Sequence, residues 1–163
     1  MEKIAFIDLE ASGLGPASWP IEVGWCFERG KPQAHLIRPA EDWKAEAWDK
    51  GAEALHGIPI DKLRKSGRTP EDVCEGLNRA LAGVSVYSDA PDWDGFWLYR
   101  LYKAAGVKQV FALNDFGAIF AGAAPADKEA AIAEAARTTP HRHRACEDVL
   151  HMREVYRLLK NRC

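Results

Sequence analysis

With 163 residues, 47% of them hydrophobic and 28% charged, the chain has the composition of one globular domain, which we expect to span residues 1–163. The formal net charge of -2 argues against a protein that coats nucleic acid, and no apolar run approaches the ~20 residues of a membrane helix. The four cysteines form no CxxC pair and the first residues lack the layout of a signal peptide, so we expect reduced thiols in the cytoplasm.

The first predicted elements are three strands. Lys3–Leu9 is short, apolar and partly β-branched. The runs Ile21–Arg29 and Gln33–Arg38 flank Gly30-Lys31-Pro32, which is typical of a hairpin turn. We therefore expect the three strands to pair in sequence as an antiparallel meander.

Helices and strands alternate in the rest of the chain. Thr69 is a typical N-cap residue and Pro70 suits the first helical position, so a helix is expected from there to about Ala82, before Gly83. The other predicted elements are helices Ala45–Leu55 and Pro59–Arg64, strand Val84–Tyr87, helix Asp92–Ala105, strand Gln109–Leu113, and helices Pro125–Ala136 and Ala145–Lys160. The last two strands follow helices and join the sheet in parallel, which predicts an α/β fold with a mixed five-stranded sheet flanked by helices.

Two carboxylates stand at the end of the first strand. Side chains alternate along a strand, so Asp8 and Glu10 point to the same side, about 6 to 7 Å apart. Neighbouring carboxylates repel each other, whereas a divalent cation bound between them reverses the sign of the interaction. The pair therefore predicts a metal site, with a polar strand end as the alternative interpretation, since Asp127 and Glu129 show the same spacing in a predicted helix.

A second acidic cluster follows the predicted strand 84–87. Asp89, Asp92 and Asp94 lie between that strand and the body of the next helix. Acids at a helix N-terminus favour the helix dipole without any function. Carboxylates beyond the end of a parallel strand also lie where α/β sheets bind ligands, so both interpretations stay open.

The third cluster lies near the C-terminus. His143 and Asp148 have the spacing of a loop-borne histidine and a helix-borne carboxylate that meet at one site, and His56 with Asp61 has the same spacing. From Arg137 to Cys163 the chain holds seven Lys or Arg against three Asp or Glu, a local charge of +4. This segment either contacts phosphates or forms a solvated helix face.

Four stretches occur in a fixed order: FIDLEASGL at 6–14, ALHGI at 54–58, WDGFWL at 93–98 and HRACED at 143–148. Together they resemble the motifs of the DEDDh 3′–5′ exonucleases, the superfamily of polymerase proofreading subunits, RNase T and oligoribonuclease. The resemblance spans nearly the whole chain. It implies a ribonuclease H-like fold, which agrees with the predicted order of elements.

The resemblance also implies a role for individual residues. Asp8 and Glu10 match the metal ligands of the first motif, Asp94 the aspartate of the second, His143 the catalytic histidine and Asp148 the last aspartate.

The resemblance leaves the ligand of the second motif open and adds four substrate-binding positions. The segment that leads into Asp94 is one residue longer than usual, so Asp89 and Asp92 are alternative ligands. The residues that match substrate-binding positions are Ser12, Gly13, Leu14 and His56.

The activity implied is hydrolysis of DNA or RNA from the 3′ end, most simply of a single strand, to release nucleoside 5′-monophosphates. Two Mg²⁺ or Mn²⁺ ions would be held by the four carboxylates, with His143 as the general base. Phosphate contacts would come from the basic C-terminal segment, and candidate stacking residues are Trp19, Trp93, Phe96, Trp97 and Tyr102. Relatives often act as homodimers. The alternatives are a non-catalytic module that binds nucleic acid or a partner, and a hydrolase of small nucleotides.

Overall fold

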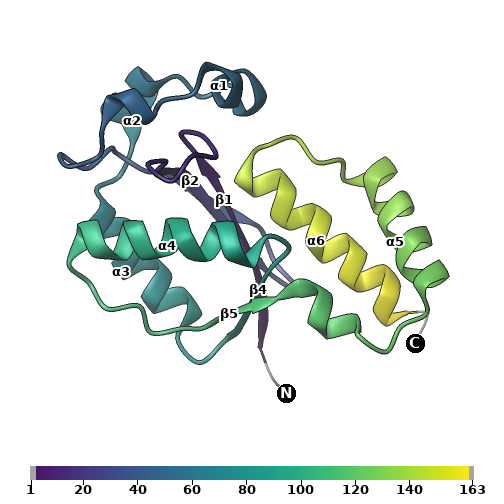
Figure 1. Ribbon diagram of the computed structural model, residues 1–163. Helices are drawn as coiled ribbons and strands as arrows, with labels where there is room; N and C mark the ends of the chain where they lie inside the picture. Colours follow the sequence, from purple (N-terminus) through teal and green to yellow (C-terminus); the bar gives the residue numbers. More distant parts are fainter. Residues whose placement is uncertain (1–2, 162–163) are drawn as a thin grey trace.

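A computed structural model describes residues 3–161 of the chain (Figure 1). Its centre is a five-stranded sheet with the order β3-β2-β1-β4-β5. The strands are β1 (Ile4–Ala11), β2 (Pro20–Phe27), β3 (Gln33–Leu36), β4 (Ser85–Ser88) and β5 (Leu113–Asp115). β1, β2 and β3 pair antiparallel, whereas β4 is parallel to β1 and β5 is parallel to β4. The predicted α/β fold with a mixed five-stranded sheet is confirmed.

Helices cover both faces of the sheet (Figure 1). They are α1 (Lys50–His56), α2 (Ile60–Ser66), α3 (Pro70–Leu81), α4 (Pro91–Ala105), α5 (Pro125–Thr138) and α6 (Ala145–Lys160), with short 3₁₀ turns η1 (Ala45–Ala47) and η2 (Phe116–Phe120). α3 and α4 lie on one face, and α6, backed by α5, lies on the other (Figure 1). In the part of the chain that is described, no helix has the length and apolar character needed to cross a membrane.

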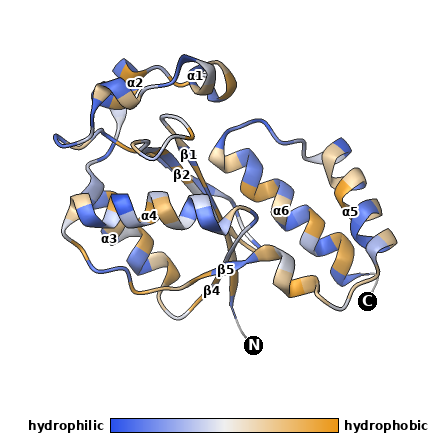
Figure 2. Cartoon of the chain, in the orientation of Figure 1, coloured by the Kyte–Doolittle hydropathy of each residue, from blue (hydrophilic) through white to orange (hydrophobic). Residues whose placement is uncertain are grey.

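The side chains of β1 divide between the two faces. Phe6 packs with Val149 and Met152 of α6, whereas Ile7 and Leu9 belong to the core cluster shared with α3 and α4. Figure 2 shows hydrophobic and hydrophilic stretches alternating along α6, as expected for a helix with one face on a core. Asp8 and Glu10 have the same parity as Phe6, so their side chains lie on the α6 face of the strand.

Local signals predicted the helix ends well. Thr69 caps α3, since its side chain accepts a hydrogen bond from the backbone N–H of Asp72 at 3.2 Å. Gly106 ends α4 with a φ of 62°, in the left-handed region that glycine adopts without strain. Each of these helix ends is set by residues within one helical turn. The local sequence was therefore sufficient to predict where the helices begin and end.

The predicted helix 45–55 is wrong in its middle. Asp49 separates η1 from α1, because its backbone N–H donates to the carbonyl of Ser12 at 2.7 Å. Its side chain accepts from the backbone N–H of Gly51 at 2.7 Å and so caps α1. A long-range contact to the β1–β2 loop thus divides what sequence pattern treats as one helix.

The predicted strand 109–113 is also displaced, since β5 occupies Leu113–Asp115. The Asn78 side chain donates to the carbonyl of Lys108 at 2.8 Å and accepts from the N–H of Val110 at 3.2 Å. These backbone groups are therefore bound to α3 rather than to the sheet. Pairing with β4 begins at Leu113, which lies opposite Val86.

Three of the four cysteines, Cys26, Cys74 and Cys146, are free thiols, and Cys163 lies outside the described residues.

Candidate active site

Five carboxylates from β1, α4, α6 and the β4–α4 loop meet beside the end of β1. Oxygen atoms of Asp8, Glu10 and Asp148 all lie within 4.8 Å of one another, and so do those of Asp8, Asp89 and Asp94. Asp8 belongs to both triplets. Carboxylate oxygens at this spacing would suit hard divalent cations, which take oxygen ligands.

Asp8 and Glu10 are poorly compensated by the surrounding protein. Burial raises the pKa of Asp8 well above its usual range, and the nearby carboxylates of Asp94 and Glu10 raise it further. Burial, followed by repulsion from Asp148, raises the pKa of Glu10 to about 8. Asp8 Oδ2 is buried and has no hydrogen-bond partner among residues 3–161. An orphaned buried oxygen within a cluster of acids fits a divalent cation better than any other ligand, because the cation supplies both the missing partner and the missing charge.

Asp94 is positioned by two hydrogen bonds. The backbone N–H of Leu9 donates to Asp94 Oδ1 at 3.2 Å, and the hydroxyl of Ser88 donates to Asp94 Oδ2. Asp94 is 1% exposed, and burial raises its pKa. Of the three aspartates that sequence reasoning left open, Asp94 and Asp89 join a triplet with Asp8, whereas Asp92 joins neither triplet.

β2 holds the first turn of α6 through a contact that sequence reasoning missed. Glu22, 3% exposed, accepts hydrogen bonds from Arg144 Nε at 3.0 Å, Arg144 Nη2 at 2.8 Å and the backbone N–H of Ala145 at 3.1 Å. A Cβ on Gly24 would lie 2.6 Å from the carbonyl atoms of Ala145, so glycine permits this close approach. The available signal was an acid inside the otherwise apolar run Ile21–Phe27.

This contact brings α6 to the acids. Glu22 lies directly opposite Glu10 in the register of β1 and β2. Asp148 lies one turn after Ala145, so the same contact places Asp148 beside Glu10. Arg144, counted in the sequence as part of a basic segment, is thus a structural partner of Glu22.

Two histidines precede α6, in different environments. His143 is exposed, has a φ of 53°, and lines a cavity together with Glu10. His141 Nδ1 lies 3.3 Å from Asp148 Oδ1, and this carboxylate raises the pKa of His141. The ring centroid of His141 lies 3.9 Å from that of His151, which is bound through Nδ1 to the carbonyl of Thr139. Sequence reasoning assigned no role to His141.

The cavity beside Glu10 and His143 has a volume of about 380 Å³. Its remaining lining residues are Ala11, Gly13, Leu14, Asp49, Gly51, Ala52, Leu55, His56 and Trp97. Three of the four predicted substrate-binding residues are therefore brought next to the acids. Leu14 is 67% exposed, as expected for a side chain at the rim of a site rather than in a core.

Ser12 and His56 have different surroundings. Ser12 is buried and does not line the cavity; its hydroxyl accepts from the N–H of Trp19 at 3.0 Å. His56 Nδ1 accepts from the N–H of Ile58 at 3.0 Å, and its Nε2 is buried without a partner in the described structure. Asp61, the alternative partner of His56 in the sequence, instead pairs with Arg64 on the surface.

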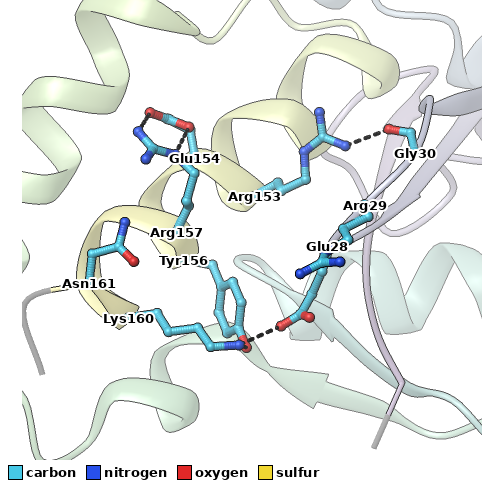
Figure 3. A pocket seen from close by; sticks show the side chains of 9 residues that line it. All are labelled: Glu28, Arg29, Gly30, Arg153, Glu154, Tyr156, Arg157, Lys160 and Asn161. Carbon is cyan, nitrogen blue, oxygen red and sulfur yellow. Dashed lines mark hydrogen bonds and ion pairs between the residues drawn. The ribbon is translucent and has the colours of Figure 1, made fainter. Parts of the chain in front are cut away.

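A second cavity, of about 640 Å³, lies at the C-terminal end of α6 (Figure 3). Arg157 pairs with Glu154 at 2.7 Å and Lys160 with Glu28 at 3.2 Å, and Arg153 donates to the carbonyl of Gly30 at 2.7 Å. Cations of the basic C-terminal segment are thus occupied by neighbouring groups. This end of α6 offers paired charges, unlike the acid cluster at the other end.

No protein-family model and no curated protein sequence matches the chain. Among solved structures, it is similar to E. coli Exonuclease I in complex with a dT13 oligonucleotide, with a TM-score of 0.75 and 15% identity, over 99% of this chain and 42% of that one. The complex with a 5cy-dT13 oligonucleotide gives a TM-score of 0.76 and 16% identity over 99% and 41%. The zinc-bound complex with single-stranded DNA gives 0.71 and 15% over 99% and 41%.

This chain spans about two fifths of the length of those Exonuclease I chains. At 15–16% identity the likeness concerns the arrangement of the backbone. The chain therefore has the ribonuclease H-like α/β fold that E. coli Exonuclease I also has.

Proposed function

We propose that this chain is a metal-dependent 3′–5′ exonuclease of the DEDDh type, which releases nucleoside 5′-monophosphates from the 3′ end of single-stranded DNA or RNA. The observation that carries the proposal is the position of Asp8 in two carboxylate triplets, with one buried oxygen left without a partner. The ordered motifs and the fold shared with Exonuclease I, whose complexes contain single-stranded DNA, support the same function.

The carboxylates would hold two Mg²⁺ or Mn²⁺ ions. Asp8, Glu10 and Asp148 form one ligand set, and Asp8 with Asp94 forms the other, to which Asp89 adds an oxygen. Bound cations supply the positive charge that lowers the pKa of an attacking water and stabilises the leaving 3′ oxygen. The hydrogen bonds from Leu9 and Ser88 keep the Asp94 carboxylate oriented for this role.

His143 would accept the proton of the attacking water at a ring nitrogen. Its side chain shares the cavity with Glu10, and a neutral imidazole has a ring nitrogen that can accept a proton, as a general base must. Because His143 directly precedes Arg144, the ion pair to Glu22 anchors the end of its loop.

The cavity would hold the 3′-terminal nucleotide. Leu14 and Leu55 would supply apolar walls for a base, and His56 lines the same cavity. We place the activity in the cytoplasm, since Cys26, Cys74 and Cys146 are free thiols.

The proposal is tested by degradation of matched single-stranded DNA and RNA labelled at the 5′ end, with Mg²⁺ or Mn²⁺. Stepwise shortening is expected for the wild type, with complete loss in chelator and in Asp8→Asn, which removes the ligand common to both triplets. Asp92→Asn is the matched control, because this acid joins neither triplet. Full activity of Asp8→Asn would refute the proposal.

A hydrolase of small nucleotides is the second candidate, because the cavity also suits a small nucleotide with no strand attached. A volume of about 380 Å³ fits one nucleotide and is too small for several. Comparing the rate on dinucleotides with the rate on oligonucleotides separates the two candidates. Turnover confined to dinucleotides would assign the small-nucleotide activity.

A further inference from the structure

One face of α4 carries a row of aromatic side chains that begins at the candidate active site. Trp97 lines the cavity beside Glu10 and His143, and its indole N–H donates to the hydroxyl of Ser18 at 2.9 Å. Trp93 stacks on Trp97, with ring centroids 5.4 Å apart and an interplanar angle of 27°. Trp97 is buried, whereas Trp93 is 40% exposed, so the outer ring presents a surface to solvent.

The row continues along the helix. The rings of Trp93 and Phe96 meet edge to face at 6.3 Å, and the guanidinium carbon of Arg100 lies 5.9 Å from the centroid of Phe96. Positions 93, 96, 97 and 100 have the spacing of one helix face. α4 begins beside the acids, since Asp94 lies in its first turn, and runs away from them (Figure 1). The row thus spans roughly 10 Å along the helix axis, at about 1.5 Å per residue.

Arg100 ends the row with an unused hydrogen-bond donor. Its Nε is buried and has no hydrogen-bond partner among residues 3–161. The cations at the end of α6 are instead bound to acids or to a carbonyl group (Figure 3). A guanidinium held over an aromatic ring, with a donor left without a partner, suits a phosphate group.

We propose that the α4 face formed by Trp93, Phe96 and Arg100 binds the single-stranded nucleic acid upstream of its 3′-terminal nucleotide. A base stacks on Trp93, and a backbone phosphate accepts hydrogen bonds from Arg100. The proposal rests on the proposed exonuclease function and adds to it the course of the strand. It assigns the strand to α4, in place of the basic C-terminal segment that charge alone had suggested.

The neighbouring side of α4 offers a matched control. Tyr99 is exposed, and Lys103 Nζ lies 5.9 Å from the centroid of its ring. This pair has the same chemistry, an exposed aromatic ring and a cation. It lines a different cavity, which contains none of the acids. Loss of binding that is specific to the α4 face must therefore spare this pair.

The test is the affinity for a fluorescent single strand of about ten nucleotides, measured by anisotropy in chelator so that no cleavage occurs. Trp93→Ala and Arg100→Gln should each weaken binding about 10-fold, whereas Trp93→Phe, Tyr99→Ala and Lys103→Ala should bind within about two-fold of the wild type. Circular dichroism checks that each variant is folded. Wild-type affinity in Trp93→Ala and Arg100→Gln would overturn the proposal, and so would failure of the wild type to bind.

A second measurement separates this proposal from the proposed function. Hydrolysis of the p-nitrophenyl ester of thymidine 5′-monophosphate requires the site but no upstream strand. Trp93→Ala and Arg100→Gln should leave that rate unchanged while raising KM for the oligonucleotide. An equal loss on the small ester would place both residues in the site and overturn the proposal.

If no substrate is hydrolysed, the exonuclease function fails, and the anisotropy series still decides whether a strand binds α4. Weaker binding in Arg157→Ala alone would place the strand on α6 and overturn the proposal.

Discussion

The two ends of α6 carry charges in opposite arrangements. At the N-terminal end, Asp148 lies within 4.8 Å of both Asp8 and Glu10, and these acids repel one another. Burial raises the pKa of Glu10 to about 8, which means that the folded chain holds the charged form at a cost. The protein maintains this cluster although it opposes folding at neutral pH.

At the C-terminal end, the charges are balanced locally. Arg157 forms a two-bond pair with Glu154, and Lys160 pairs with Glu28 (Figure 3). Such surface pairs contribute roughly 0–1 kcal/mol and need no other explanation than a solvated helix end. The comparison teaches that net charge along a segment is a poor guide to a binding site. Uncompensated charge in a buried place is a better one.

Among the variants that distinguish the two ends of α6, His143→Ala is expected to have the largest effect on activity. His143→Ala should lower kcat by about 10²–10⁴-fold, the contribution typical of a general base. Affinity for Mn²⁺, measured by isothermal titration calorimetry, should change little, because the acids remain. His141→Ala should cost less. A larger loss in His141→Ala than in His143→Ala would transfer the base to His141.

Glu22 tests whether the N-terminal end depends on the position of α6. Glu22→Gln keeps the size of the side chain but removes the charge that binds Arg144, so His143 should lose its fixed position. We expect kcat to fall by roughly 10–100-fold, with little change in KM. The matched control is Glu154→Gln, which breaks an Arg pair at the other end of the same helix. Equal effects of the two variants would contradict the assignment.

The pH dependence of stability tests the acid cluster without any substrate. Because burial raises the pKa of Glu10 from 4.5 to about 8, its contribution to stability is fully present below about pH 4.5 and is lost as the pH rises through about 8. The Tm of the protein in chelator should therefore fall over that range, and Mn²⁺ should raise it most at the upper end.

Glu10→Gln should flatten this profile and reduce the stabilisation by Mn²⁺. A profile that is already flat in the wild type would mean that the acids are compensated by groups other than a cation.

The smallest effect is expected at the C-terminal end of α6. Arg157→Ala removes one surface pair and should lower the free energy of unfolding by less than about 1 kcal/mol, measured by urea denaturation. The rate on oligonucleotides should not change. A marked loss of activity would show that the paired cations also take part in binding.

Local sequence signals were sufficient for most of the fold. The N-cap Thr69 and the glycine that ends α4 act within one helical turn, so the ends of α3 and α4 could be predicted from a few residues. The displaced strand β5 could not, because Asn78 on α3 holds the backbone at Lys108 and Val110. That contact joins residues about 30 positions apart, which no local pattern records.

The candidate site also has features that the local sequence predicts and features that depend on the tertiary structure. The sequence by itself determined that Asp8 and Glu10 share a side of β1, since alternation is a property of any strand, and that His143 precedes the helix of Asp148. The tertiary structure decided which acids of the second cluster join them, namely Asp94 and Asp89 and not Asp92. Asp94 approaches Asp8 because α4 packs its first turn against the backbone of Leu9, a contact over 85 residues.

The tertiary structure also decided which groups pair with the basic residues of the C-terminal segment. Composition counts charges, whereas pairing depends on which strands and loops lie beside a helix after folding. Arg144 meets Glu22 of β2, and Lys160 meets Glu28 beyond its end, over more than 100 residues of sequence. The physical reason is that a Coulomb interaction falls with distance in space, and only the fold brings these residues to hydrogen-bonding distance.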